Sequence, residues 1–242
     1  MSQQKPSITI TYDIRQEDGG YGIVISRTTI NKTKEKYLTT PRGRRLLLPR
    51  TELAAAMVAE LASGVKKNDG LFLQLAMTAV DHGAASAQEK IFWSLLENDS
   101  LRHCPRQPPD LHHYLTLQWQ NSWEWAEKNW GGHWPLIGDG FTTTPLPATI
   151  AAALRPTCDH WNSWQWVAMV HTATLLTSSL LAFRFFNDKL FTPLEAVNQS
   201  RAEELFQEER WGTLPDVAAR RLATAQELEQ LHHWWGWVSP PQ

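Results

Sequence analysis

Cysteine is scarce in this chain, since Cys104 and Cys158 are the only two among 242 residues. One bridge at most can form, which excludes a disulfide scaffold, and a reducing compartment is the simpler interpretation. No excess of charge of one sign is present either: 23 Lys and Arg stand against 25 Asp and Glu, a net charge of −2. The chain as a whole is therefore not drawn toward nucleic acid or a membrane surface.

A long uncharged apolar run is also missing. The nearest candidate, Trp166 to Phe183, has no Asp, Glu, Lys or Arg, but His, Ser and Thr interrupt it. A spanning helix needs about 20 predominantly apolar residues, so we expect a buried central helix of a soluble bundle and no membrane insertion. Met1 to Ser7 resembles neither a secretory signal nor a transit peptide. We therefore expect a bacterial cytoplasmic protein, or a mitochondrial matrix protein whose transit peptide has been removed.

Motifs for nucleotide binding and catalysis are missing as well. The sequence has no phosphate-binding loop, no nucleophile elbow and no His-Glu-x-x-His pattern. Nine histidines invite a metal interpretation, but Cys158-Asp159-His160 lacks partners at zinc-finger spacing. We expect no cofactor, no metal and no enzymatic activity. A metal- or small-molecule-dependent enzyme in the His- and Trp-rich second part of the chain stays as the least favoured alternative.

The charges that are present are distributed unevenly. Residues 1–64 carry ten Lys and Arg and six Asp and Glu, a net of +4, whereas the remainder carries a net of −6. This asymmetry predicts two different surfaces. Few aromatic residues that could stack on bases accompany the basic segment, so we expect no nucleic-acid partner. The basic residues of the segment are Lys32, Lys34, Lys36, Arg42, Arg44, Arg45 and Arg50.

The pattern along the chain predicts an α+β fold. Residues 7–13 and 21–26 alternate like strands on either side of Gly19-Gly20, which predicts a hairpin, and further short strand candidates follow as far as Leu48. Thr51 begins a helix, and all 13 tryptophans come after residue 92 in helical patterns. We predict a small N-terminal antiparallel β domain with a closing helix, residues 1–64, and a larger C-terminal α-helical bundle domain, residues 65–242.

Four long helices are predicted in the second part. Asp110 should cap the first, which Gly131-Gly132 closes, and the next should cover residues 159–186. The third, residues 193–211, begins with a capping pattern of Thr192, Pro193 and Glu195, and Gly212 follows it as a C-cap. The fourth, residues 215–234, carries an apolar stripe that includes Leu222. Most of the tryptophans should fill the core of this bundle.

The third helix has an acidic outer face, which by itself indicates only a solvated surface. Its residue order, however, resembles the terminal signature of the ATP-twelve family, the assembly chaperones that hold the alpha subunit of the soluble catalytic sector of F-type ATP synthase. Further blocks of the same family follow in order over most of the chain: Gly19 to Val24, Thr40 to Arg44, Leu71 to Asp81 and Trp119 to Glu127. The terminal signature reads Ser200-Arg201-x-Glu203-Glu204-x-Phe206-Gln207-x-x-Arg210-Trp211-Gly212.

This resemblance implies a small β domain joined to a helical domain, and a monomeric, non-enzymatic chaperone. It implies that the protein binds the free alpha subunit, prevents its aggregation and releases it on assembly with beta. Glu203, Glu204 and Gln207 should lie on or beside the contact surface, with Trp211 and Gly212 fixing the end of the helix. The alternative is a protein-interaction module of the same fold with a different client.

Overall fold

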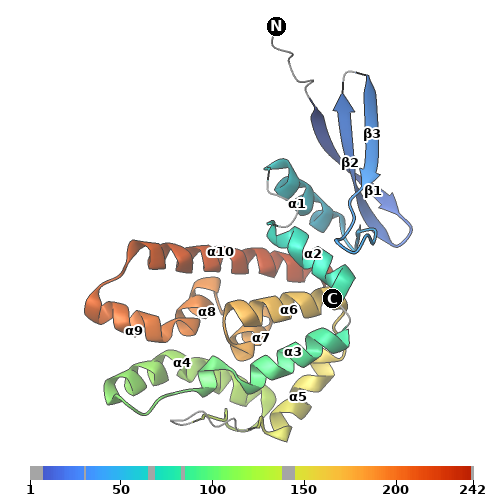
Figure 1. Ribbon diagram of the computed structural model, residues 1–242. Coiled ribbons are helices and arrows are strands. Elements are labelled where there is room, and N and C mark those ends of the chain that lie inside the picture. The colour runs from blue at the N-terminus through green and yellow to red at the C-terminus, as the bar shows by residue number, and fades with distance from the viewer. Residues whose placement is uncertain (1–7, 30, 65–68, 83–84, 138–144, 241–242) are drawn as a thin grey trace. The chain divides into compact units, whose positions relative to one another are not determined.

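The computed structural model of the chain describes residues 8–29, 31–64, 69–82, 85–137 and 145–240. These residues cluster into two compact units, one formed by residues 1–84 with 236–242 and one by residues 85–235. The first unit contains the antiparallel sheet, and the named elements described in the second unit are helices, so the predicted α+β class is confirmed (Figure 1). The domain boundary expected at residue 64 stays a prediction.

The sheet of the first unit is built around one long central strand. β1 (Thr9–Glu17) and β2 (Gly20–Thr29) pair antiparallel from Thr9 opposite Thr28 to Glu17 opposite Gly20, which confirms the hairpin. β3 (Lys32–Tyr37) pairs with the other edge of β2, and β4 (Leu47–Leu48) pairs with the beginning of β2. Gly20 has a φ of 152°, and a Cβ there would lie 2.5 Å from the Leu48 carbonyl oxygen. Only glycine therefore lets β4 approach so closely.

Two helices complete the first unit. α1 (Thr51–Ala62) buries Leu53, Met57 and Leu61, and its neighbours are β1 and β2. α2 (Leu71–His82) begins under the carboxylate of Glu60, which accepts from the backbone N–H groups of Phe72 at 2.9 Å and Leu73 at 3.0 Å. A side chain of α1 thus satisfies two of the free N–H groups at the start of α2.

Two arginines of the expected basic segment are used at the other end of α2. Arg42 donates to the Asp81 carbonyl oxygen at 3.3 Å, and Arg44 donates to the Val80 carbonyl oxygen at 2.8 Å. The Asp81 carboxylate in turn accepts from the Thr40 hydroxyl at 2.8 Å. Cations at a helix C-terminus satisfy its last carbonyl groups, so these arginines hold the 40–44 turn on the helix.

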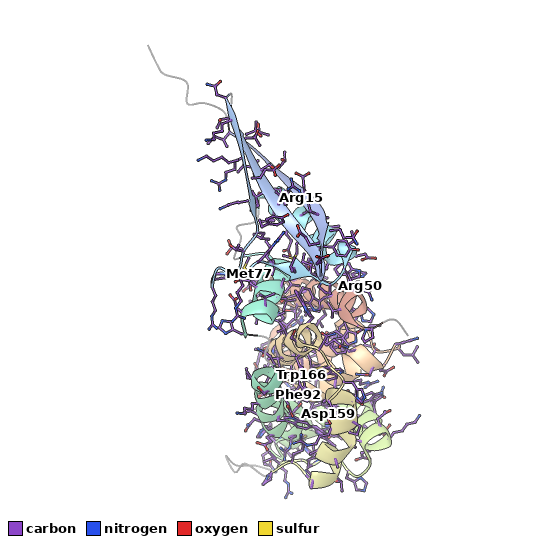
Figure 2. All side chains as sticks on the ribbon, turned by 90° about the vertical axis from the view of Figure 1, so that its right-hand side faces the viewer. Arg15, Arg50, Met77, Phe92, Asp159 and Trp166 are labelled. Carbon is purple, nitrogen blue, oxygen red and sulfur yellow. The ribbon has the colours of Figure 1, made fainter. Side chains whose placement is uncertain are left out.

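The second unit is a bundle with an aromatic core. Phe92, Trp161 and Trp166 meet edge to face, with ring centroids 4.9–6.2 Å apart. Phe92 and Trp166 are labelled in Figure 2. Such offset contacts add to the gain from burial alone. The elements that follow the sheet unit are α3 (Ala85–Glu97), a 3-10 turn (Ser100–Arg102), α4 (Pro109–Trp130), α5 (Ala148–Cys158), α6 (Ser163–Leu175), α7 (Ser179–Asn187), α8 (Pro193–Ser200), α9 (Ala202–Trp211) and α10 (Pro215–Val238).

The helix predicted over residues 159–186 is wrong, because the chain breaks it between α6 and α7. Thr177 has a φ of 51°, and Ser178 caps α7 by accepting from the Leu181 N–H at 3.0 Å. The apolar run from Trp166 to Phe183 is therefore divided between two helices. In the described part of the chain, no helix has the length and apolar character needed to cross a membrane.

Two details of the long helices also differ from the prediction. Pro108, not Asp110, occupies the N-cap of α4, and Asp110 lies in the first turn with its carboxylate paired to Arg210. Leu222 of α10 is 58% exposed, whereas Ala225, Leu228 and Leu231 are buried. Steps of three residues drift around a helix that has 3.6 residues per turn, so Leu222 lies about 120° away from Leu228.

Asp99 joins the 3-10 turn to the start of α7. Its side chain is fully buried and accepts from the Leu101 N–H at 3.0 Å, the Ser178 hydroxyl at 3.0 Å and the Leu180 N–H at 2.8 Å. Burial raises the pKa of this carboxyl to about 6, although the three donors work in the opposite direction. The unfolded chain should titrate near the ordinary value of about 3.9.

Asp99 should make the free energy of unfolding depend on pH. Because the folded pKa is the higher one, the contribution of Asp99 to stability is greatest below about pH 4 and is lost as the pH rises through about 6. Asp99→Asn removes this titration. Urea unfolding at pH 4 and at pH 7 should show the wild-type free energy of unfolding, taken relative to that of the variant, falling by about 2 kcal/mol between these two pH values. A difference that does not change with pH would contradict the role of Asp99.

Candidate partner-binding groove

A hydrogen bond from α4 divides the helix that was expected over residues 193–211. The Trp119 indole N–H donates to the Gln199 carbonyl oxygen at 2.8 Å, and the Ser122 hydroxyl donates to the Gln199 side chain at 2.5 Å. Arg201 then leaves helical geometry, with φ −113° and ψ 24°. The predicted capping box at Thr192 and Glu195 is confirmed, but a single continuous helix is wrong.

The break allows α8 and α9 to bury different faces. α8 buries Ala196 and Val197, and α9 buries Ala202 and Phe206. An unbroken helix could not bury both sets, since Val197 and Ala202 lie about 140° apart on a regular helix. Because α9 starts anew at Ala202, the side of α9 that does not carry Ala202 and Phe206 faces away from the core.

A groove of about 870 Å³ lies between α9 and α10. A short loop joins these two helices (Figure 1). On the α9 wall, Glu204, Gln207 and Trp211 follow one another at helical spacing. The loop contributes Gly212 and Leu214. The α10 wall is formed by Val217, Arg220, Arg221, Ala223, Thr224 and Glu227.

Trp211 is the most distinctive residue of the groove. All 13 tryptophans lie in the described ranges, and Trp211 alone is exposed, at 77%, whereas the others are buried or half-buried. Leu214, which also lines the groove, is 63% exposed. Tryptophan is the residue most enriched at the energetic centres of protein interfaces. Two large apolar side chains at one groove are what a protein-binding site requires.

Charged groups in the groove are mainly paired with one another. Arg221 forms a bidentate pair with the Glu208 carboxylate, with one of its two contacts at 2.8 Å, and both side chains are largely buried. This pairing lowers the pKa of Glu208 and raises the pKa of Arg221. Glu204 is more open: its carboxylate lies 3.8 Å from Arg201 and its side chain is 53% exposed. Glu204 can therefore exchange its partner for a cation on a bound protein.

The structure brings four of the five expected contact residues to this groove. Glu204, Gln207, Trp211 and Gly212 line it, whereas Glu203 is exposed on α9 outside the lining. Adjacent helical residues point about 100° apart, which explains why the two glutamates separate. Sequence reasoning missed the α10 wall and Leu214. An apolar residue directly before the helix-starting Pro215 was the available signal for Leu214.

Among the described residues that line the groove, none is a cysteine or a histidine. Cys104 and Cys158 are buried and form no disulfide, and burial raises the pKa of the Cys158 thiol to about 12. Among the residues that the structure describes, no three His, Cys, Asp or Glu side chains are grouped to hold a metal ion.

Known structures share this architecture. No family model matches the chain. The crystal structure of Atp12 from Paracoccus denitrificans superposes with a TM-score of 0.75 at 21% identity, covering 95% of this chain and 96% of that one. The chain has the Atp12 fold. An Atp12 mutant from the same organism, with lysine in place of an aspartate, gives a TM-score of 0.74 at 20% identity over 95% of this chain and 96% of that chain.

A third structure agrees with the Atp12 fold. The Agrobacterium tumefaciens protein Atu1473, to which a chaperone role has been ascribed, gives a TM-score of 0.76 at 21% identity, covering 96% of this chain and 84% of that one. The fold that the sequence resemblance implied, a small β part followed by helices, is therefore confirmed. Because only about one residue in five is identical, this agreement establishes the Atp12 fold and does not by itself establish a function.

Gly212 should be required by its backbone conformation, not by lack of space. Its φ is 87°, and a Cβ there would meet nothing within 4 Å. Gly212→Ala should lower the free energy of unfolding by about 1 kcal/mol, because L-residues are strained at positive φ. Gly236→Ala is the matched control: this exposed glycine is helical, a Cβ there also has open space, and alanine should stabilise it by about 0.5–1 kcal/mol. Chemical unfolding of both variants would refute the assignment if their effects had the same sign.

Proposed function

We propose that this protein is an assembly chaperone that binds the free alpha subunit of the ATP synthase catalytic sector, and that the groove between α9 and α10 holds part of this client. The observation that carries the proposal is the exposure of Trp211 on the wall of a groove in an Atp12 fold. The residue order from Ser200 to Gly212, which resembles the signature of the chaperone family, forms α9 and its end.

The physical task of such a chaperone is to cover a surface until the proper subunit arrives. An unassembled alpha subunit exposes the interface meant for beta, and large exposed apolar patches aggregate. Trp211 and Leu214 can cover apolar side chains of the client, and Glu204 can pair with a cation beside them. Since Glu208 and Arg221 neutralise each other, the groove adds little unpaired charge of its own.

Release needs no chemical step. The alpha–beta contact is a permanent interface, and such interfaces are larger and more apolar than transient ones. Beta can therefore displace a chaperone of moderate affinity by competition alone. A protein with this role needs neither a nucleotide site nor a catalytic group.

Trp211→Ala tests the groove as the contact. Co-expression with the alpha subunit, followed by size exclusion, should give a complex with the wild type and none with beta. Trp211→Ala should weaken alpha binding by about 30-fold, which corresponds to about 2 kcal/mol for a central tryptophan. Leu190→Ala is the control, because Leu190 is 86% exposed and lies outside the groove lining. Equal binding by both variants would show that the groove is not the contact.

Glu204→Lys and Glu203→Lys separate the groove from the acidic face as a whole. Both variants change the charge by the same amount on neighbouring exposed positions of α9, but only Glu204 lines the groove. Glu204→Lys should weaken alpha binding by about tenfold, whereas Glu203→Lys should change it by less than about threefold. Circular dichroism verifies that both variants fold. Equal losses of affinity in the two variants would indicate a diffuse electrostatic attraction by the acidic face and not binding in the groove.

The choice of client is tested separately. If the wild type forms no complex with alpha or beta, a pull-down from the organism's own extract, with Trp211→Ala as the negative control, identifies the protein bound in the groove. A different client lost with Trp211→Ala would favour an interaction module of the same fold.

A further inference from the structure

The three long strands of the first unit sort their charges between the two faces of the sheet. In antiparallel pairs, directly opposed residues share a face. Ile10 opposes Arg27, Tyr12 opposes Ile25, and Ile25 opposes Lys36. These residues and Lys34, which opposes Arg27, therefore share one face. We name this set the open face: Ile10, Tyr12, Ile25, Arg27, Lys34 and Lys36.

The strand carboxylates all lie on the opposite face, and two of them are neutralised there. Arg15, labelled in Figure 2, pairs with Glu35 at 2.7 Å. Glu17 pairs with Arg45 at 2.5 Å and also accepts from the Tyr37 hydroxyl, which lowers the pKa of Glu17. The third carboxylate, Asp13, opposes Val24, whose other partner is Tyr37, so it also belongs to that face. The open face consequently combines three exposed cations with apolar side chains and contains no strand carboxylate.

Helix α1 covers only part of this face. Ile23, farther along the same face, is 1% exposed, whereas Ile10 is 45% exposed and Arg27 is exposed beside it. The strands extend beyond α1 in Figure 1. A cavity of about 210 Å³ lies where α1 stops covering this face. It is lined by Leu61 of α1 and by Tyr12, Ile25 and Lys36. The apolar surface thus continues from the core of the unit into solvent.

Protection of the sheet edge does not account for this pattern. Lysines on an edge strand discourage pairing with other chains, which could explain Lys34 and Lys36 on β3. Arg27, however, lies on the central strand β2, and Ile10 lies on the opposite edge strand β1. Neither an exposed isoleucine nor a cation on a central strand reduces edge-to-edge pairing.

We propose that the open face is a second docking surface, independent of the groove, for an acidic amphipathic segment of a protein partner. Apolar side chains of the segment would cover Ile10 and Ile25, and its carboxylates would pair with Arg27, Lys34 and Lys36. A surface that combines cations with apolar side chains selects a partner that carries the opposite charge and an apolar side of its own. Nucleic acid fits less well, because stacking on bases needs aromatic side chains and Tyr12 is the only aromatic residue of the open face.

A pair of synthetic peptides tests this surface without the ATP synthase subunits. The probe is a labelled amphipathic helical peptide of about 18 residues with leucine on one side and glutamate on the other; its counterpart carries lysine for glutamate. Fluorescence anisotropy on the full-length protein should show binding of the acidic peptide and at least tenfold weaker binding of the basic one. Lys34→Glu with Lys36→Glu should weaken the acidic peptide by about tenfold, and Ile10→Ser should weaken it by about threefold.

Matched variants separate this surface from general electrostatics and from the groove. Lys128→Glu with Lys189→Glu makes the same charge change at exposed lysines of the second unit and should alter binding by less than about twofold. Trp211→Ala should not change the affinity for the acidic peptide, because Trp211 belongs to the groove. The peptide test therefore stays valid even if the groove does not bind the alpha subunit. Equal binding of both peptides, or no effect of the β3 variant, would overturn the proposal. So would a single-stranded oligonucleotide that binds the open face more tightly, or self-association of the free protein that the β3 variant abolishes.

Discussion

The hydrogen bond from the Trp119 indole to the Gln199 carbonyl oxygen, 2.8 Å long, determines how the end of the helical unit is arranged. Without it, the stretch from Pro193 to Trp211 could continue as one helix, as its capping pattern indicates. With it, the chain stops at Ser200 and restarts at Ala202, so that α8 and α9 each bury their own apolar pair. The side of α9 that does not carry its buried residues then lines the groove together with α10. The groove therefore depends on the division of this stretch into two helices.

An exposed tryptophan has a cost in free energy that the rest of the chain avoids. The other 12 tryptophans are at least half-buried, many of them in edge-to-face contacts, whereas Trp211 is 77% exposed just before a glycine at positive φ. Gly212 ends α9 abruptly and lets α10 begin within a few residues, so Trp211 and Leu214 stay on the wall of one groove. A side chain of this size left in solvent is most simply explained by a partner that covers it.

The sequence predicted the elements better than their boundaries. The hairpin, the α+β class and the capping box at Thr192 followed from local patterns, because turns and caps depend on neighbouring residues. The breaks at Thr177 and Arg201 could not be predicted, since a side chain of another helix takes the Gln199 carbonyl and residue 177 adopts an unusual φ. For the groove, the α9 wall was predicted through resemblance, whereas the α10 wall depends on how two helices approach each other. Likewise, the sorting of charges on the open face needed the strand register.

Site-specific photo-crosslinking would show whether a client binds beside Trp211. A photoreactive phenylalanine analogue at position 211, and separately at position 190, would be irradiated in the presence of the alpha subunit. We expect a crosslink to alpha from position 211, its loss when beta is added, and none from position 190. Crosslinks from position 190 with none from position 211 would contradict a client bound between α9 and α10.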